Sequence, residues 1–362
     1  MSTRIRVGIR CDAGPHTGVG HLVRCVALAE ELTARGVAVH FLADLGGLDW
    51  ALQQLTRRGL PLHPAPGDPT GLVAAADRLG LDAVVVDSYV LPPEHSAALR
   101  AAARTVFAIV DGDRRGQEAD LYVDQNLDAE LSPPPDLPPG AIRLAGLEYA
   151  LLRRAIRDLR PAAPPSASAC AAPRVSGTAR RMGGDVPRVV AFFGGTDAYR
   201  AAPVVARLLR DTGAAFAATI VAADAGLRAE LQAVTPAPGQ RLEIIDPTDE
   251  LPKVLADADL VLSASGTSTW ELLCLGLPAA LVWVVDNQIL GYERTTARGL
   301  AAGLGHLPAL RDSAAGASAA VTVLRDLLTK PADRAALAAR AWAAVDGRGC
   351  ARVADALINA VS

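Results

Sequence analysis

The chain has 362 residues and a formal net charge of −3; 51% of its residues are hydrophobic and 21% are charged. Domains commonly hold about 100–200 residues, so this length and composition indicate two domains, each with its own core. The charge balance provides no basic surface for nucleic acid, and the five cysteines are scattered without a C-x-x-C spacing, which argues against a disulfide framework or a structural zinc site.

The chain carries no evident secretion or membrane signal. Residues 1–10 lack the apolar stretch of a signal peptide. The most apolar run elsewhere, Ala279–Val285, is far shorter than the ~20 residues that span a bilayer. We therefore expect a soluble, cytoplasmic protein, and the sequence leaves its oligomeric state open.

In the first half, short apolar runs alternate with helical segments. The predicted strands are Ile5–Ile9, Val37–Leu42, Ala83–Val86, Val106–Val110, Leu121–Val123 and Ile142–Ala145. Helices are predicted at His21–Arg35, Leu48–Arg58 and Pro92–Ala103, and Gly36 ends the first of them. The run before Asp87 is apolar throughout, which is typical of a parallel strand buried on both faces.

Residues 161–187 interrupt this alternation, because they are rich in Pro, Ala, Ser, Gly and Arg and have no apolar period. Such a composition predicts a flexible linker. Strands are then predicted at Val189–Phe193, Ala217–Val221, Leu242–Ile245, Leu260–Ser263 and Ala279–Val284, and the end of the chain is helical. We expect an α/β protein of two Rossmann-like domains facing a cleft, residues 1–160 and 188–362, with the last helix packing back on the first domain.

The first candidate cluster follows the first strand, at Thr17–Cys25. Glycines there allow a ligand to approach the backbone, and a helix N-terminus favours an anion. The motif is not G-x-G-x-x-G, because Val23 occupies the third glycine position, so a dinucleotide site is disfavoured. A plain tight turn is the alternative. His21 favours function, because a histidine at this edge suits acid–base chemistry near pH 7.

Two further clusters follow strands of the first half. Asp87-Ser88-Tyr89 comes directly after a buried strand, where polar groups contact a substrate or orient the histidine; the alternative is an aspartate that caps the next turn. Asp111-Gly112-Asp113 resembles a metal-binding D-x-D, but a glycine between two acids is also an ordinary turn, and we favour the turn.

Three polar clusters mark the second half. Backbone N–H groups of Phe193–Asp197 can cradle a phosphate, and the hydroxyl-rich Ser263–Thr269 opens a predicted helix where N–H groups are free. Glu271, within that helix, suits the two hydroxyls of a ribose; its alternative role is interaction with the helix dipole. Asp286-Asn287-Gln288 ends another strand and suits sugar hydroxyls or a phosphate.

Several of these stretches, in this order, resemble one family. They are Gly18–Cys25 with Ala27–Ala29, Val86–Tyr89, Ala119–Asn126, Gly146–Arg153, Phe193–Asp197, Gly266–Glu271, Asn287-Gln288 and Asp346–Gly349. The chain resembles the UDP-sugar hydrolases of pseudaminic acid biosynthesis, a family that includes spore-coat polysaccharide proteins. It is more distantly similar to the N-acetylglucosaminyltransferase that forms lipid II, which implies a GT-B type fold.

The resemblance implies a role for each matching residue. It places catalysis on His21, Tyr89 and Asn287, the diphosphate on Gly194–Thr196 and Ser265–Ser268, the ribose on Glu271 and the uracil near the backbone of Ile244. The expected substrate contacts in full are Gly18, Gly20, Arg24, Asp87, Gly194, Gly195, Thr196, Ile244, Ser265, Gly266, Thr267, Ser268, Glu271 and Gln288. The family works without a metal or another cofactor, so none is expected here.

The expected activity is hydrolysis of a UDP-sugar to UDP and a free amino or deoxy sugar, by inverting attack of water at the anomeric carbon. The alternative is an inverting glycosyltransferase that uses a UDP-sugar donor and an alcohol acceptor. A non-catalytic sugar-nucleotide sensor is a third possibility, which His21 and Tyr89 disfavour. The sequence departs from the family at Ser265, where glycine is common, at Asp286, where glutamate is common, and in the long 161–187 segment, and these differences leave the sugar open.

Overall fold

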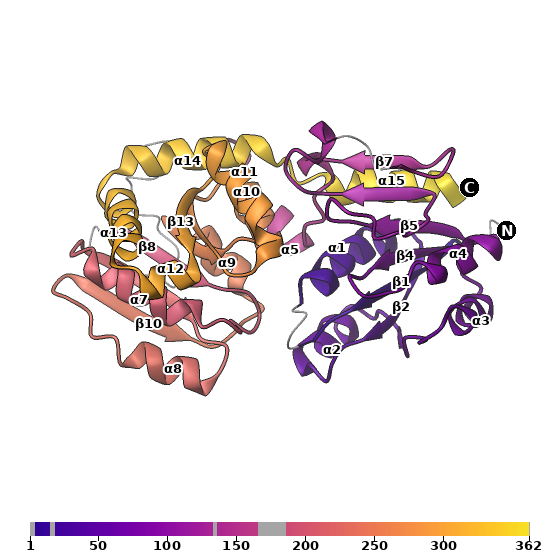
Figure 1. Ribbon diagram of the computed structural model, residues 1–362, viewed down its shortest axis with the longest axis horizontal. Helices are drawn as coiled ribbons and strands as arrows, with labels where there is room; N and C mark the ends of the chain where they lie inside the picture. The colour runs from indigo at the N-terminus through magenta and orange to yellow at the C-terminus, as the bar shows by residue number, and fades with distance from the viewer. Residues whose placement is uncertain (1–3, 15–18, 133–135, 166–185, 362) are drawn as a thin grey trace. The chain divides into compact units, whose positions relative to one another are not determined.

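The computed structural model describes residues 4–14, 19–132, 136–165 and 186–361 (Figure 1). The chain forms two compact units: unit 1 comprises Met1–Arg154 and Gly347–Ser362, and unit 2 comprises Ala155–Asp346. Most of the segment expected to be a linker, 161–187, lies outside the described residues. In the part of the chain that the structure describes, no helix combines the length and the hydrophobicity needed to cross a membrane.

Within its described residues, unit 1 contains a seven-stranded parallel sheet in the order β3-β2-β1-β4-β5-β6-β7. The strands are β1 (Arg6–Asp12), β2 (Ala38–Asp44), β3 (Leu62–His63), β4 (Ala83–Asp87), β5 (Thr105–Ile109), β6 (Leu121–Asp124) and β7 (Ile142–Ala145). The order reverses between β1 and β4, and parallel α/β sheets bind ligands at the carboxyl end of such a switch point.

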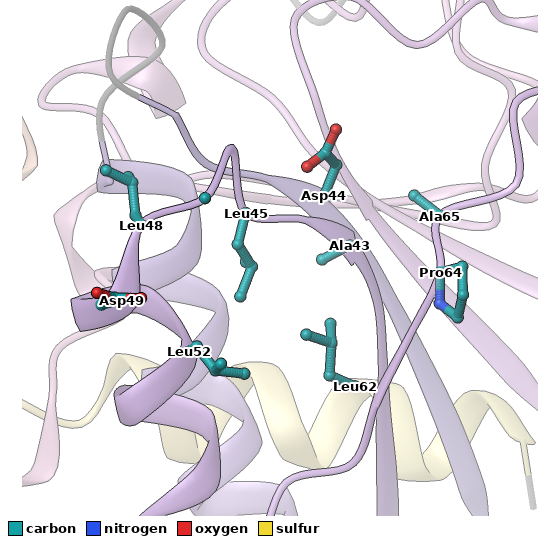
Figure 2. Close-up of a pocket in the computed structure, with 10 residues that line it drawn as sticks. Ala43, Asp44, Leu45, Leu48, Asp49, Leu52, Leu62, Pro64 and Ala65 are labelled. Carbon is teal, nitrogen blue, oxygen red and sulfur yellow. The ribbon is translucent and has the colours of Figure 1, made fainter.

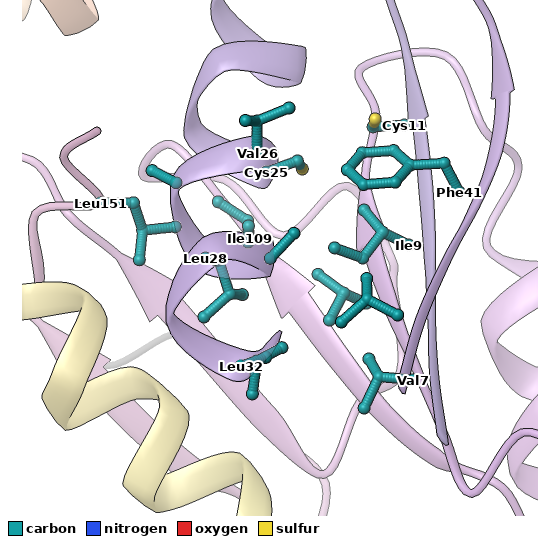
Figure 3. Packing of buried hydrophobic residues seen from close by; sticks show 14 of the residues in the cluster. Val7, Ile9, Cys11, Cys25, Val26, Leu28, Leu32, Phe41, Ile109 and Leu151 are labelled. Atoms are coloured by element: carbon teal, nitrogen blue, oxygen red, sulfur yellow. The ribbon is translucent and has the colours of Figure 1, made fainter. Parts of the chain in front are cut away.

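Helices cover both faces of this sheet. They are α1 (Gly20–Ala34), α2 (Asp49–Thr56), α3 (Pro69–Leu79), α4 (Glu94–Ala101) and α15 (Gly349–Val361), with short 3₁₀ turns η1 (Ala129–Leu131) and η2 (Leu147–Tyr149). Side chains of β1 alternate between the faces. Val7, Ile9 and Cys11 pack with α1, α2 and α15, as Figure 3 shows for the α1 side, while α3 and α4 pack on the opposite face.

The last helix belongs to the core of unit 1. Cys350, Val353 and Leu357 of α15 are fully buried in the cluster that includes α1. Gly349 begins the helix against the backbone of Ala150, and a Cβ at this position would overlap that backbone. Only glycine, which has no Cβ, lets the start of α15 approach this backbone so closely.

Unit 2 repeats the same strand order. Its described residues form a six-stranded parallel sheet, β10-β9-β8-β11-β12-β13. The strands are β8 (Arg188–Phe192), β9 (Phe216–Val221), β10 (Gln240–Ile245), β11 (Leu260–Ala264), β12 (Ala279–Trp283) and β13 (Ala302–His306). The switch point lies between β8 and β11. The helices are α7 (Ala201–Asp211), α8 (Ala225–Gln232), α9 (Leu251–Ala256), α10 (Thr267–Leu275), α11 (Ile289–Ala297), α12 (Leu307–Asp312), α13 (Ala314–Thr329) and α14 (Pro331–Ala344).

The chain passes from unit 1 to unit 2 within the short helix α5 (Arg154–Arg157), so the expected boundary at residue 160 lies inside unit 2. Arg160 donates to the carbonyls of Cys274 in α10 and Trp342 in α14, at 2.6 and 2.9 Å. Its guanidinium also lies 4.4 Å from the centre of the Trp342 ring. These contacts attach the segment after α5 to the helices of unit 2.

Several elements were not expected from the sequence, among them β3, α3 and β13. The β13 sequence, Ala-Gly-Leu-Gly-His, has no β-branched residue and two glycines, so nothing in it indicates a strand. It forms one because β12 offers it a free sheet edge, with a register irregularity at Leu281/Val282. Tertiary pairing here overrides local preference.

Candidate functional site

In unit 1, polar side chains gather at the carboxyl end of the switch point between β1 and β4. His21 is the second residue of α1, which follows β1, and Gly20 is the first. Asp87 is the last residue of β4, and β4 pairs with β1 so that Asp87 lies opposite Cys11. Gly18, expected to contact the substrate, lies outside the described residues. The topology therefore brings His21 and Asp87 together from distant parts of the chain.

The ring of His21 is oriented by Asp87. Its Nδ1 lies 3.2 Å from the backbone oxygen of Asp87 and 3.3 Å from carboxylate Oδ1. Both partners are acceptors, so the neutral ring carries its proton on Nδ1 and leaves Nε2 unprotonated. The imidazole is 14% exposed. This is the arrangement of a positioned general base whose orientation a carboxylate fixes.

Beneath the histidine, a buried arginine joins two carboxylates. Arg24 donates to both oxygens of Asp87, at 2.7 and 2.6 Å, and to both oxygens of Asp111, at 2.9 and 3.1 Å. Arg24 is 2% exposed and Asp87 is fully buried. Burial alone would lower the pKa of Arg24, but the charges of both carboxylates raise it well above its usual value. The guanidinium therefore stays charged and holds both acids in place.

Asp111 links this network to Tyr89. Its carboxylate accepts from the Tyr89 hydroxyl at 2.6 Å and from the Asn126 amide at 3.1 Å. Burial would raise the pKa of Asp111. The charge of Arg24, and hydrogen bonds from Arg24, Tyr89 and Asn126, nevertheless hold this pKa far below its ordinary value. Burial and the charge of Asp111 raise the pKa of Tyr89, so its hydroxyl remains a donor. The Tyr89 ring meets the His21 ring edge-on, with centroids 4.3 Å apart.

The sequence did not predict that Asp111 and Asn126 belong to this cluster. The interpretation of residues 111–113 as a turn describes Asp113, whose carboxylate accepts from the backbone of Arg115 at 2.8 Å. It does not describe Asp111, which ends the segment after β5 and points into the cluster. A signal was available, because β5 and β6 end at the same edge as β4, and polar residues follow both of them.

Arg115 adds a half-buried cation beside Tyr89. Its guanidinium lies 4.2 Å from the centre of the Tyr89 ring, and its φ of 50° is unusual for a residue with a side chain. Among the described residues, no carboxylate pairs with it; its side chain donates only to the Asp113 carbonyl, at 3.3 Å. The local backbone thus holds a positive charge next to the tyrosine.

In unit 2, the expected diphosphate residues lie at the ends of β8 and β11, the two strands of the switch point. Gly194, Gly195 and Thr196 form the turn after β8, and Gly194 has a φ of 79° with open space where a Cβ would stand. Asp197 then accepts from the first N–H groups of α7, those of Ala201 and Ala202, at 2.8 and 2.9 Å. The N-terminus of α7 is therefore capped by the protein itself.

The loop after β11 leads directly into α10. The Ser265 N–H donates to Val282 of β12, at 2.8 Å, and the Gly266 N–H donates to the Thr269 hydroxyl, at 3.2 Å. Thr267 and Ser268 are the first residues of α10, where N–H groups have no partner within the helix. Glu271, in the second turn, is 6% exposed.

The 3₁₀ turn η4 (Asp286–Gln288) lies beside this loop. Gln288 accepts from the Val284 N–H at 2.8 Å, and its amide nitrogen is 4.0 Å from the position that a Cβ at Gly266 would take. Asn287 is exposed. Ile244, in the edge strand β10, has its carbonyl occupied by Arg228 at 3.1 Å. The residues expected at the strand ends thus lie at one edge of the unit 2 sheet.

An aromatic pair at the same edge was missed. Trp283 ends β12 and His306 ends β13, and their rings stack with centroids 3.6 Å apart and an interplanar angle of 5°. Nothing in the local sequence singles out this histidine, because its partner is distant in the chain. Among the described residues, no three His, Cys, Asp or Glu side chains are grouped so that they could hold a metal ion.

No protein-family model matches the sequence, and no curated protein sequence matches it. Solved structures do. MurG of Acinetobacter baumannii superposes with a TM-score of 0.68 at 16% identity, over 98% of this chain and 99% of that one. A UGT89C1–UDP complex from Arabidopsis thaliana superposes with a TM-score of 0.66 at 14% identity, over 99% of this chain and 100% of that one. UDP-GlcNAc 2-epimerase from Neisseria meningitidis, bound to UDP-GlcNAc, superposes with a TM-score of 0.62 at 12% identity, over 98% of this chain and 100% of that one.

The chain has the GT-B fold. Its two parallel sheets share one strand order, and the likeness to these structures extends over nearly the whole chain. At such low identity the likeness concerns the fold, so the chemistry of this GT-B protein has to be argued from its own residues.

Proposed function

We propose that this GT-B protein uses a UDP-sugar and catalyses attack of a hydroxyl group on its anomeric carbon, with His21 as general base. The observation that carries the proposal is the contact between His21 and Asp87. It leaves Nε2 unprotonated on a ring whose orientation is set, which is what removal of a hydroxyl proton requires. The fold is also that of proteins described as bound to UDP or UDP-GlcNAc.

The network below His21 has a positioning role in this proposal. In this proposal Arg24 and Asp87 act through the histidine, because they are buried and bound to each other and Asp87 lies against the His21 ring. Tyr89 keeps its proton and is partly exposed, so it can donate to or pack against the sugar. Asp111 and Asn126 hold Tyr89 in position.

Unit 2 would hold the nucleotide. N–H groups of the Gly194–Thr196 turn and of Thr267 and Ser268, at the start of α10, are the candidate donors to the diphosphate. The N–H groups at the start of α7 are not candidates, because the Asp197 carboxylate already accepts from them. Glu271 would accept the ribose hydroxyls, and Asn287 and Gln288 would face the sugar. These donors stabilise the charge that develops on the leaving diphosphate.

In the reaction, Nε2 of His21 takes the proton of the attacking hydroxyl as the new C–O bond forms. The bond from the anomeric carbon to the diphosphate oxygen breaks, and its electron pair leaves with UDP. Attack from the opposite face inverts the configuration. We favour an alcohol as the acceptor, because MurG and a glycotransferase of kitacinnamycin are among the similar structures. Water is the second candidate, supported by the motif resemblance to the UDP-sugar hydrolases.

The test is a mass-spectrometric screen of UDP-sugars with the enzyme alone and with a set of alcohols. Glycoside formed only with an alcohol supports transfer, and free sugar plus UDP without one supports hydrolysis. Conversion of the donor into another UDP-sugar, or binding of UDP without turnover of any donor, would overturn the proposal. His21→Ala serves as the inactive control.

A further inference from the structure

Unit 1 contains a pocket of about 480 Å³ at the carboxyl ends of β2 and β3. Figure 2 shows that it lies between the end of β2, the first turns of α2 and the segment that follows β3. Leu45, Leu52 and Leu62 surround it, and Leu52 and Leu62 keep 47% and 37% of their surface exposed. Exposed leucines gathered around a concave surface indicate a binding site for an apolar group.

The charged side chains around this pocket are acidic. Asp44 ends β2 and Asp49 begins α2, and both are exposed. Among the residues that the structure describes, no lysine or arginine lines the cavity. One oxygen of Asp44 accepts from the Gly46 N–H at 2.9 Å. Two carboxylates without a cation repel a phosphate or carboxylate ligand, so this pocket does not suit a nucleotide. They do accept hydrogen bonds from hydroxyl or ammonium groups.

The pocket lies on the same sheet edge as His21. Ala43, in its wall, pairs with Cys11 of β1, and Cys11 pairs in turn with Asp87 of β4. Neighbouring strands are about 4.8 Å apart, so Ala43 and Asp87 are separated by roughly 10 Å along this edge. The pocket and His21 thus lie at the carboxyl ends of neighbouring strands, so an elongated molecule seated in the pocket can carry a hydroxyl toward the histidine that Asp87 orients.

We propose that this pocket binds the apolar part of the acceptor, a small amphiphilic alcohol that carries no negative charge. The inference rests on the proposed transfer function and adds the chemical class of the acceptor. A volume of about 480 Å³ is in the range of small-molecule sites, which are typically about 300–1,000 Å³. The acidic rim excludes anions, and the leucines bind the apolar end while its hydroxyl faces His21.

A matched series of three probes tests the chemistry. 3-Phenylpropan-1-ol, 3-phenylpropan-1-amine and 3-phenylpropanoate share one apolar group and differ only in their polar end. Titrated by NMR into the full chain, the alcohol and the amine should bind at least about tenfold more tightly than the carboxylate. Equal binding of all three, or tightest binding of the carboxylate, would overturn the assignment.

Variants locate the binding. Leu52→Gln should weaken the alcohol about fivefold to tenfold, because a large apolar contact is lost. The control is Leu131→Gln, which changes a leucine of unit 1 that is 67% exposed and lies outside the pocket. In the double variant Asp44→Asn with Asp49→Asn, the carboxylate should bind nearly as well as the alcohol. An unchanged affinity in Leu52→Gln, or equal losses in both leucine variants, would contradict the proposal.

Turnover separates this inference from the function on which it rests. With an accepted UDP-sugar, Leu52→Gln should raise the KM for the alcohol and leave the KM for the donor unchanged. An alcohol that binds at the leucines but is never glycosylated would overturn the acceptor role. If no UDP-sugar is bound or consumed at all, the proposed function fails, while the probe titration still decides whether the pocket exists as a site for apolar alcohols and amines.

Discussion

His21 receives its orientation from two different acceptors of one residue, the backbone oxygen and the carboxylate of Asp87. His21→Ala should lower kcat by ~10²–10⁴-fold, the usual scale for a positioned acid–base group. Affinity for UDP should be retained, because the nucleotide is assigned to unit 2. Steady-state kinetics and calorimetric titration measure the two effects. His40→Ala changes another histidine of unit 1, in the middle of β2 and outside both the cluster and the pocket, and should keep full turnover.

Glu271 allows a similar separation of roles. A carboxylate near the start of a helix contributes only ~0.3–1 kcal/mol through the helix dipole. If it also accepts two ribose hydroxyls, Glu271→Gln should weaken UDP binding by ~1.5–3 kcal/mol, the range for hydrogen bonds to a charged group. Binding of 2′-deoxy-UDP should weaken much less. Titration of both ligands into both proteins isolates the ribose contact, and equal losses for the two nucleotides would remove Glu271 from the nucleotide site.

At the scale of elements, the Asp197 side chain caps the N-terminus of α7. It is 6% exposed, and its carboxylate receives two backbone N–H groups of the helix. Burial raises its pKa from 3.8 to about 6, although those hydrogen bonds oppose the change. The folded state therefore retains a proton that the unfolded chain releases near pH 4. The contribution of Asp197 to the free energy of unfolding therefore falls as pH rises from about 4 to 6, by about 3 kcal/mol, and then levels off.

Asp197→Asn should remove this dependence, because asparagine is neutral at every pH and its oxygen still accepts one N–H of α7. The difference in melting temperature between variant and wild type should grow in favour of the variant between pH 4 and 6. Differential scanning calorimetry at intervals across this range checks it. A difference that stays constant with pH would show that the carboxyl group titrates at its ordinary value in the folded protein.

At the scale of the whole molecule, the chain leaves unit 1 at Arg154 and returns to it at Gly347. Leu357, five residues from the C-terminus, is fully buried in the core of unit 1. Leu357→Ala should therefore destabilise unit 1 by ~2–5 kcal/mol, as expected for a buried leucine. Hydrogen exchange should accelerate in the strands of unit 1. The matched control is Leu209→Ala in the core of unit 2, which should accelerate exchange there instead.

The strand alternation, the two Rossmann-like sheets and the placement of His21, Asp87 and Tyr89 at strand ends could be predicted, because apolar periodicity and glycine turns are local properties. The element limits, β13 and Asp111 could not. β13 forms only because β12 supplies a partner, and Asp111 belongs to the cluster because three strands end beside one another. Contacts of this kind depend on pairing over long sequence distances.

The sequence by itself determined the fold class and the strand ends that hold the candidate residues, since a parallel sheet buried on both faces requires continuous apolar runs. Only the tertiary structure decided what those residues do. It buried Arg24 between two carboxylates, assigned Asp197 to the start of α7 and left an apolar pocket beside β2. Ion pairs, caps and cavities arise from distances between side chains far apart in the chain, and local sequence does not specify those distances.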